Sequence, residues 1–237
     1  GRPLKRSPRA QGIPVIRMSP AWTSSDRARA QELGVLDCLT KPCDTQLLRT
    51  CFLAVRRSLQ LRVILDEPDH RDPITLLANE TGFHRLVEML WPICTENQDP
   101  IVLIALEIRP PRYSPGPEDD PSVLVREVAR KLNQGLRTTD YLAHMGGWRF
   151  AVLAPECEPA YARQLGERLR RVLARVFESR DQVEGRVPQE PHSLNLGIFA
   201  LGSTSKISGD AAVAIALENV ERARASGPDA TVVQLQE

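Results

Sequence analysis

The pair Gly146-Gly147 constrains the fold of this chain more than any other feature of its sequence. It lies between the apolar stretches "YLAHM" and "RFAVLA", each long enough for a short strand. Two consecutive glycines tolerate the positive φ angles that a primed two-residue β-turn requires. The pattern therefore predicts an antiparallel hairpin, around which the second half of the chain must fold.

The elements on either side of this hairpin alternate between strand and helix patterns. Five prolines exclude regular structure from residues 109–121, and Asp120-Pro121 is a typical cap and first position for the next helix. We expect strands over residues 101–108, 193–201 and 231–235, and helices over residues 80–90, 121–136, 210–225 and onwards from Pro159. These elements predict an α/β (α+β) fold in which helices flank a central mixed sheet.

The first part of the chain shows a second, shorter alternation. "IPVIRMS" and "VLDCLT" are typical of buried strands, and the pattern of residues 25–34 predicts a short helix between them. Asp44 is the expected N-cap of a longer helix that continues to Pro68, and such a helix is suited to a dimer stalk. Two strands are too few for a domain, so this segment represents part of one.

Composition excludes several classes of protein. The 31 basic and 30 acidic residues leave a net charge of +1, which gives no support to a nucleic-acid or membrane-surface role. No run of 18 apolar residues and no signal peptide is present, so we expect no membrane span. The five cysteines are scattered without a Cys-x-x-Cys pair, which argues against zinc sites and disulfides. These features predict a soluble, cytoplasmic protein.

Residues 1–56 resemble the C-terminal half of a response-regulator receiver domain. The resemblance rests on "PVIRMS", which ends in Ser19, and on "LGVLDCLTKP", which contains Lys41. It implies bacterial two-component signalling, with Ser19 as the switch hydroxyl and Lys41 as the phosphate contact. The family's acceptor Asp would precede Ser19, and residues 1–12 contain none. We therefore expect this remnant of the receiver site to have no phosphorylation task in this chain.

Residues 57–71 are the expected helical linker, and residues 72–237 resemble a GGDEF domain of the diguanylate cyclases. The matching segments occur in the family's order: "DPITLLANETGF", "IVLIALEI", the hairpin, "LNLGIFAL" and "NVERARASGPD". Active members condense two GTP molecules into cyclic di-GMP. Their chemistry requires hard oxygen ligands for Mg²⁺, which neutralises phosphate charge.

The resemblance also implies that the active site is degenerate. The family's metal ligands are an acidic residue on the first strand, where Glu107 stands, and the acidic pair after Gly146-Gly147, where Trp148 and Arg149 stand. Neither replacement coordinates a cation. We therefore expect no metal, no catalytic residues and no cyclase activity. Two alternatives for the replaced pair are a salt bridge from Arg149 to Glu107 and a Trp148 ring that fills the vacated nucleotide pocket.

Other positions of the family's active site are changed as well. The guanine-reading segment is replaced by the proline-rich "RPPRYSPGPEDDPS". Leu76 occupies the place of a tight-turn glycine, and Pro228 occupies the place of a basic residue near the end. Several losses at one site indicate that the catalytic machinery as a whole is gone.

The resemblance also implies a second site, which in the family is inhibitory and binds the product. Its Arg-x-x-Asp motif is present as Arg137 to Asp140, five residues before the Gly-Gly pair, and Arg168 matches a further arginine on the next helix. Arginine can fork onto guanine or phosphate, and aspartate can accept from guanine N–H groups. The leading hypothesis is an inactive GGDEF domain that binds cyclic di-GMP at these residues and relays binding to an unidentified protein partner.

The alternative hypothesis belongs to another class of protein. The receiver-like half retains the face that receivers use to dimerise, so the chain is also suited to a homodimeric scaffold that binds a protein partner and no nucleotide. Neither hypothesis requires a cofactor, a nucleic acid or a membrane.

Overall fold

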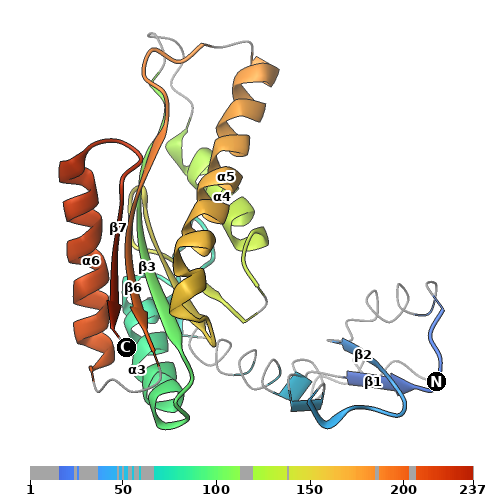
Figure 1. Ribbon diagram of the computed structural model, residues 1–237. Coiled ribbons are helices and arrows are strands. Elements are labelled where there is room, and N and C mark those ends of the chain that lie inside the picture. The colour runs from blue at the N-terminus through green and yellow to red at the C-terminus, as the bar shows by residue number, and fades with distance from the viewer. Residues whose placement is uncertain are drawn as a thin grey trace. The chain divides into compact units, whose positions relative to one another are not determined.

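The structure is a computed structural model that describes residues 16–23, 26, 37–46, 48–49, 51–52, 55, 59, 67–112, 120–137, 139–184, 187–202 and 207–236. The chain divides into two compact units, residues 1–63 and residues 64–237 (Figure 1). None of the helices in the described part of the chain combines the length and the apolar composition needed to cross a membrane.

The first unit contains two short parallel strands, β1 (Ile16–Ser19) and β2 (Asp37–Thr40), in which Ser19 lies opposite Thr40. The backbone N–H of Lys41 donates to the carbonyl of Ser19 over 2.8 Å, so both residues of the predicted receiver site lie at the same end of neighbouring strands. Asp44 accepts from the N–H of Gln46 over 3.1 Å, as expected of an N-cap. The predicted helix over residues 25–34 and the last part of the predicted stalk helix fall largely outside the described residues.

The second unit confirms the predicted α/β architecture. Its sheet has the strand order β4-β5-β3-β6-β7, with bounds Tyr141–His144, Arg149–Pro155, Ile101–Arg109, Ser193–Leu201 and Thr231–Gln236. Neighbours pair antiparallel except for β6 and β7, which pair parallel, so the sheet is mixed. Helices α4 (Pro121–Gln134) and α5 (Pro159–Glu184) lie on one side of it and α6 (Gly209–Ser226) on the other (Figure 1).

The central strand β3 is buried along almost its whole length because helices cover both faces of the sheet. Its alternate residues Val102, Ile104, Leu106 and Ile108 belong to the core cluster that also contains the inner faces of α4 and α5. The other face packs against α6 and α3 (Glu80–Glu96). The continuous apolar pattern "IVLIALEI" is explained by this two-sided burial.

The start of α4 and the end of α3 can be compared with the bounds predicted from local patterns. The cap of α4 is confirmed, because the Asp120 side chain accepts from the N–H of Ser122 over 2.9 Å and Pro121 is the first helical residue. The predicted end of α3 at residue 90 is wrong, since the helix continues through Pro92 to Glu96. Burial of Trp91, whose indole N–H donates to the carbonyl of Ile207 over 2.8 Å, holds the helix past the proline.

The predicted antiparallel hairpin is confirmed, but its turn is one residue longer than expected. The N–H of Met145 donates to the carbonyl of Arg149 over 2.9 Å, so Gly146, Gly147 and Trp148 form a three-residue turn. Both glycines have positive φ, at 88° and 59°. The two-residue prediction failed because Trp148 belongs to the turn and not to the strand.

Leu76 occupies a backbone conformation that ordinarily favours glycine. Its φ is +62°, and its side chain is 56% exposed. A left-handed conformation costs an L-residue roughly 1–2 kcal/mol. Glycine would adopt this conformation without strain, and a glycine is the residue that the resemblance places at this position.

We expect the substitution Leu76→Gly to raise the free energy of unfolding by about 0.5–1 kcal/mol, because relief of strain exceeds the added flexibility of the unfolded chain. Urea-induced unfolding followed by tryptophan fluorescence measures the change. Val123→Gly is the matched control, since Val123 is 54% exposed but lies in α4, where glycine destabilises a helix. Equal destabilisation by both substitutions would contradict the interpretation.

Candidate ligand-binding site

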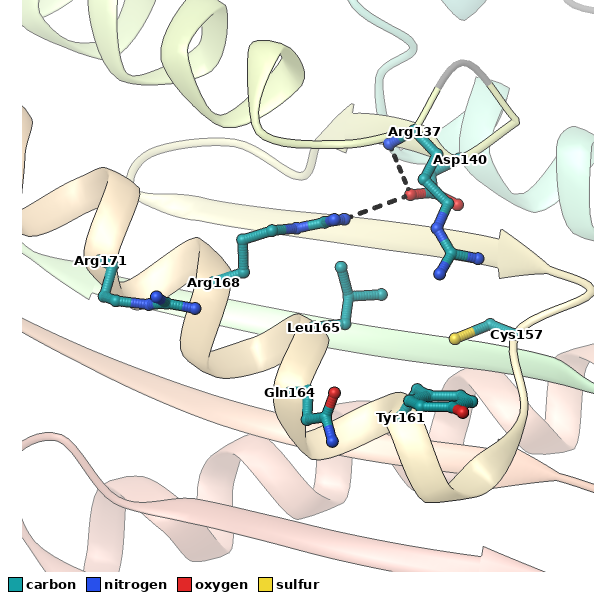
Figure 2. Close-up of a pocket in the computed structure, with 8 residues that line it drawn as sticks. All are labelled: Arg137, Asp140, Cys157, Tyr161, Gln164, Leu165, Arg168 and Arg171. Atoms are coloured by element: carbon teal, nitrogen blue, oxygen red, sulfur yellow. Dashed lines mark hydrogen bonds and ion pairs between the residues drawn. The ribbon is translucent and has the colours of Figure 1, made fainter.

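A pocket of about 190 Å³ lies beside the first three turns of α5, and it brings together the three residues of the predicted ligand site. Figure 2 shows these residues around one space, with Arg137 and Asp140 on the side opposite α5. The complete lining is Arg137, Asp140, Cys157, Tyr161, Gln164, Leu165, Arg168 and Arg171.

Arg137 and Asp140 are held by a tight loop between α4 and β4. The N–H of Asp140 donates to the carbonyl of Arg137 over 3.0 Å, and the Asp140 carboxylate accepts from the N–H of Arg137 over 2.8 Å. The side chain of Asp140 is only 2% exposed, whereas Arg137 is exposed. The loop thus buries the carboxylate and leaves the Arg137 guanidinium available to a ligand.

Arg168 approaches the same carboxylate from α5. Its Nη2 atom lies 3.8 Å from Oδ2 of Asp140, which is a loose ion pair (Figure 2). Its Nε atom is buried and has no hydrogen-bond partner in the described part of the chain. A buried donor without a partner is costly, and a ligand oxygen in the pocket would satisfy it.

The wall of the pocket near the start of α5 is less polar. Leu165 and Cys157 are buried there. Burial raises the pKa of the Cys157 thiol, although the guanidinium groups of Arg137 and Arg168 act in the opposite direction. The thiol therefore stays neutral at physiological pH and serves as part of an apolar wall.

Sequence reasoning missed Tyr161, Gln164 and Arg171 as lining residues. They are separated from Arg168 by seven, four and three residues, so all four side chains share one face of α5. Helical spacing counted from Arg168 was the pattern that would have identified them.

Three residues of the predicted degenerate active site, Glu107, Trp148 and Arg149, line a separate cavity of about 330 Å³ on the sheet. In the register of the sheet, Glu107 lies opposite Arg149 on β5 and opposite Asn195 on β6. Trp148 also lines the cavity and packs partly against the core, so it borders this space without filling it. Gly146 and Gly147 are exposed in the turn beside it.

The alternative of a salt bridge between Glu107 and Arg149 is wrong, although the two residues are direct cross-strand neighbours. Oε1 of Glu107 lies 3.5 Å from Nη1 of Arg224 on α6. Arg149 instead donates a long hydrogen bond of 3.4 Å to the carbonyl of Met145 in its own hairpin. The ion-pair partner of Glu107 is therefore Arg224, which lies 117 residues further along the chain in α6.

These residues do not fit the Mg²⁺ ion of a cyclase. Glu107 contributes the one carboxylate among the residues that line this cavity, and an arginine already pairs with it. The turn beside it contributes an indole and a guanidinium, neither of which ligates a hard cation. No cluster of three or more histidine, cysteine or acidic side chains suited to a metal ion occurs among the described residues.

His144 connects the hairpin to the opening segment of the second unit. Its Nδ1 atom lies 3.0 Å from Oδ1 of Asp72, and its Nε2–H donates to the carbonyl of Gly147 over 2.9 Å. The side chain of His144 is buried, with only 3% of it accessible. The strand carries this ring inward against Phe150, at 5.0 Å between ring centroids.

Asp72 accepts from both the N–H and the hydroxyl of Thr75, each over 2.7 Å. Burial acts to raise the pKa of Asp72, but the hydrogen bonds from Thr75 and the contact with His144 together hold that pKa below its ordinary value. Asp72 is therefore a charged anchor that joins the opening turn to the hairpin.

Comparison with known proteins shows which family part of the second unit resembles. Residues 122–230 match the family model described as diguanylate cyclase, GGDEF domain. The matched range includes the hairpin and every residue that lines the α5 pocket. This part of the second unit is therefore similar to a GGDEF domain.

Among individual proteins, the chain is similar to the response regulator PleD of Caulobacter vibrioides. The two are 26% identical over 242 residues, which covers 97% of this chain and 52% of PleD. The chain thus spans about half the length of the curated relatives it matches.

Two solved structures share the fold. Diguanylate cyclase SiaD from Pseudomonas aeruginosa, in complex with its activator SiaC, has a TM-score of 0.55 at 19% identity, covering 89% of this chain and 75% of that chain. The GGDEF domain of DgcB from Caulobacter crescentus, in complex with cyclic di-GMP, has a TM-score of 0.50 at 18% identity, covering 70% and 93%.

Proposed function

We propose that this GGDEF domain is a receptor for cyclic di-GMP without cyclase activity, and that it passes the binding signal to a protein partner. The observation that carries the proposal is the α5 pocket, where Arg137, Asp140 and Arg168 face one space. The solved DgcB domain, which shares this fold, is a complex with cyclic di-GMP.

The charge of the pocket favours such a ligand. Three guanidinium groups and a single carboxylate line it, so it attracts an anion. Arginine forks match phosphate oxygens and the Hoogsteen edge of guanine, while the Asp140 carboxylate can accept from guanine N–H groups. Cyclic di-GMP offers both kinds of group in one molecule.

The absence of cyclase activity is supported by the other cavity. Its metal-ligand positions carry Trp148 and Arg149, and Glu107 is paired with Arg224. Without a divalent ion, no metal would neutralise the charge of a GTP triphosphate near the Glu107 carboxylate. The hydroxyl of GTP that attacks the phosphate would also lack activation.

We expect calorimetric titration of the full chain with cyclic di-GMP to show micromolar or tighter binding, corresponding to about 8 kcal/mol. The substitution Arg137→Ala should weaken binding by at least about tenfold, since it removes a charge-assisted contact of roughly 1.5–3 kcal/mol. Arg163→Ala is the matched control, because Arg163 is an exposed arginine of α5 outside the pocket. A parallel incubation with GTP and Mg²⁺ should yield no product.

Equal affinity of the Arg137→Ala and unmodified chains would contradict the proposed site. If the unmodified chain gave no heat, the receptor function would fail altogether. The homodimeric scaffold would then be the better candidate, because Phe52 and Leu59 of the first unit expose 67% and 42% of their surface.

A further inference from the structure

Tyr161 is an exposed aromatic ring at one end of the cationic α5 pocket. It lies in the first turn of α5, where its N–H donates to the carbonyl of Glu158 over 2.9 Å. More than half of its surface, 52%, is accessible. Core packing therefore does not account for the side chain, and a ligand can reach it.

The chemistry of the pocket changes along one face of α5. Tyr161, Gln164, Arg168 and Arg171 follow each other at intervals of three or four residues, and the distance from first to last is about 15 Å along the helix axis. Figure 2 shows Tyr161 beside Cys157 at one end of this row and Arg171 at the other. One end thus presents a flat ring above an apolar wall, and the other presents guanidinium groups.

A ligand that satisfies both ends must carry a flat aromatic group for the ring and anionic groups for the arginines, over the roughly 10 Å of helix that separates Tyr161 from Arg168. Nucleotides have this construction, with phosphates for the arginines and a base for the ring. Base–aromatic stacking contributes roughly 1–3 kcal/mol per base. Tyr161 is the one aromatic side chain among the residues that line the pocket.

We propose that Tyr161 is a specificity-determining residue of this site, against which a purine base of the bound nucleotide stacks while Arg168 and Arg171 hold its phosphates. This inference rests on the proposed function, since it concerns how cyclic di-GMP is recognised in the same pocket. It extends the site beyond the arginine and aspartate motif to the whole exposed row of α5.

The test compares three substitutions of Tyr161 in the full chain titrated with cyclic di-GMP. Tyr161→Phe retains the ring, so its affinity should stay within about twofold of the unmodified chain. Tyr161→Leu retains apolar volume without the ring, and Tyr161→Ala retains neither, so both should bind about tenfold more weakly. A decrease in the ultraviolet absorbance of guanine on binding reports stacking directly, and it should disappear in the leucine variant.

The possible results separate this inference from the proposed function. Lack of binding by the unmodified chain would overturn both. Normal binding by the unmodified chain, with the leucine and alanine variants equal to it and an unchanged absorbance signal, would overturn only the role of Tyr161. Because Tyr161 is exposed, thermal unfolding should be the same for all four proteins, which excludes misfolding as a cause of weaker binding.

Discussion

The substitution Gly197→Ala is expected to lower the free energy of unfolding by at least about 3 kcal/mol, the largest effect of any change considered for this chain. Gly197 lies in the middle of β6, where α6 crosses the sheet. A Cβ atom at this position would lie 2.2 Å from the carbonyl oxygen of Ala216 and 2.2 Å from the backbone nitrogen of Val220.

The expected loss is large because both obstructing atoms belong to the helix backbone. A side chain can change rotamer to make room, but here the whole helix would have to move away from the strand. Such a movement would also strain the buried hydrogen bond from the Asn219 side chain to the carbonyl of Ile198, which is 3.0 Å long. Urea-induced unfolding of the full chain measures the effect, and the melting temperature should fall by about 6–12 °C.

Gly166→Ala is the matched control for this prediction. Gly166 lies in α5 and is also buried, but its nearest neighbours are the Cδ1 atoms of Leu196 and Ile198, at 3.0 and 3.2 Å. These side-chain ends can shift, and alanine favours the helix by about 1 kcal/mol. We expect little net change at Gly166, and similar stabilities of the two variants would refute the backbone argument.

The second large effect is expected at Asp72. Asp72→Ala should destabilise the fold by about 3 kcal/mol, because it removes the acceptor for two hydrogen bonds from Thr75 and leaves Nδ1 of the buried His144 without its partner. Asp72→Asn is the matched control. Its amide oxygen still accepts from Thr75 but carries no charge, so we expect a smaller loss.

The effect of Asp72 should depend on pH with a defined sign. Its pKa is lower in the folded chain than in the unfolded chain, so the stability it contributes is complete above the unfolded value of about 4. That contribution is lost as the pH falls through the lower, folded value. The difference between wild type and Asp72→Ala should therefore be constant near neutrality and shrink below about pH 4. A difference that persists unchanged at pH 2 would refute the charged-anchor interpretation.

Much of the architecture followed from local sequence patterns. The hairpin, the cap of α4 by Asp120 and the order of strands and helices were predicted from Gly-Gly, Asp-Pro and apolar periodicity. The resemblance to GGDEF domains implied that Arg137, Asp140 and Arg168 share one site, and the α5 pocket brings these three residues together. Their role in binding cyclic di-GMP stays a prediction, as does the receiver-like nature of residues 1–56.

Two of the errors share a cause, because each concerned an interaction with a distant part of the chain. Helix α3 continues past Pro92 because the buried Trp91 donates to the carbonyl of Ile207. Glu107 pairs with Arg224 of α6 and not with Arg149. Local patterns contain none of these partners.

The sequence by itself thus determined the elements of the second unit and the retained motif, since capping, turn formation and periodicity act over a few residues. Only the tertiary structure decided which charges meet. It paired Glu107 with Arg224 and not with its neighbour Arg149, and it aligned Tyr161 with Arg168 and Arg171 beside Asp140. The physical reason is that such contacts depend on how helices pack on the sheet, and packing joins residues far apart in the chain.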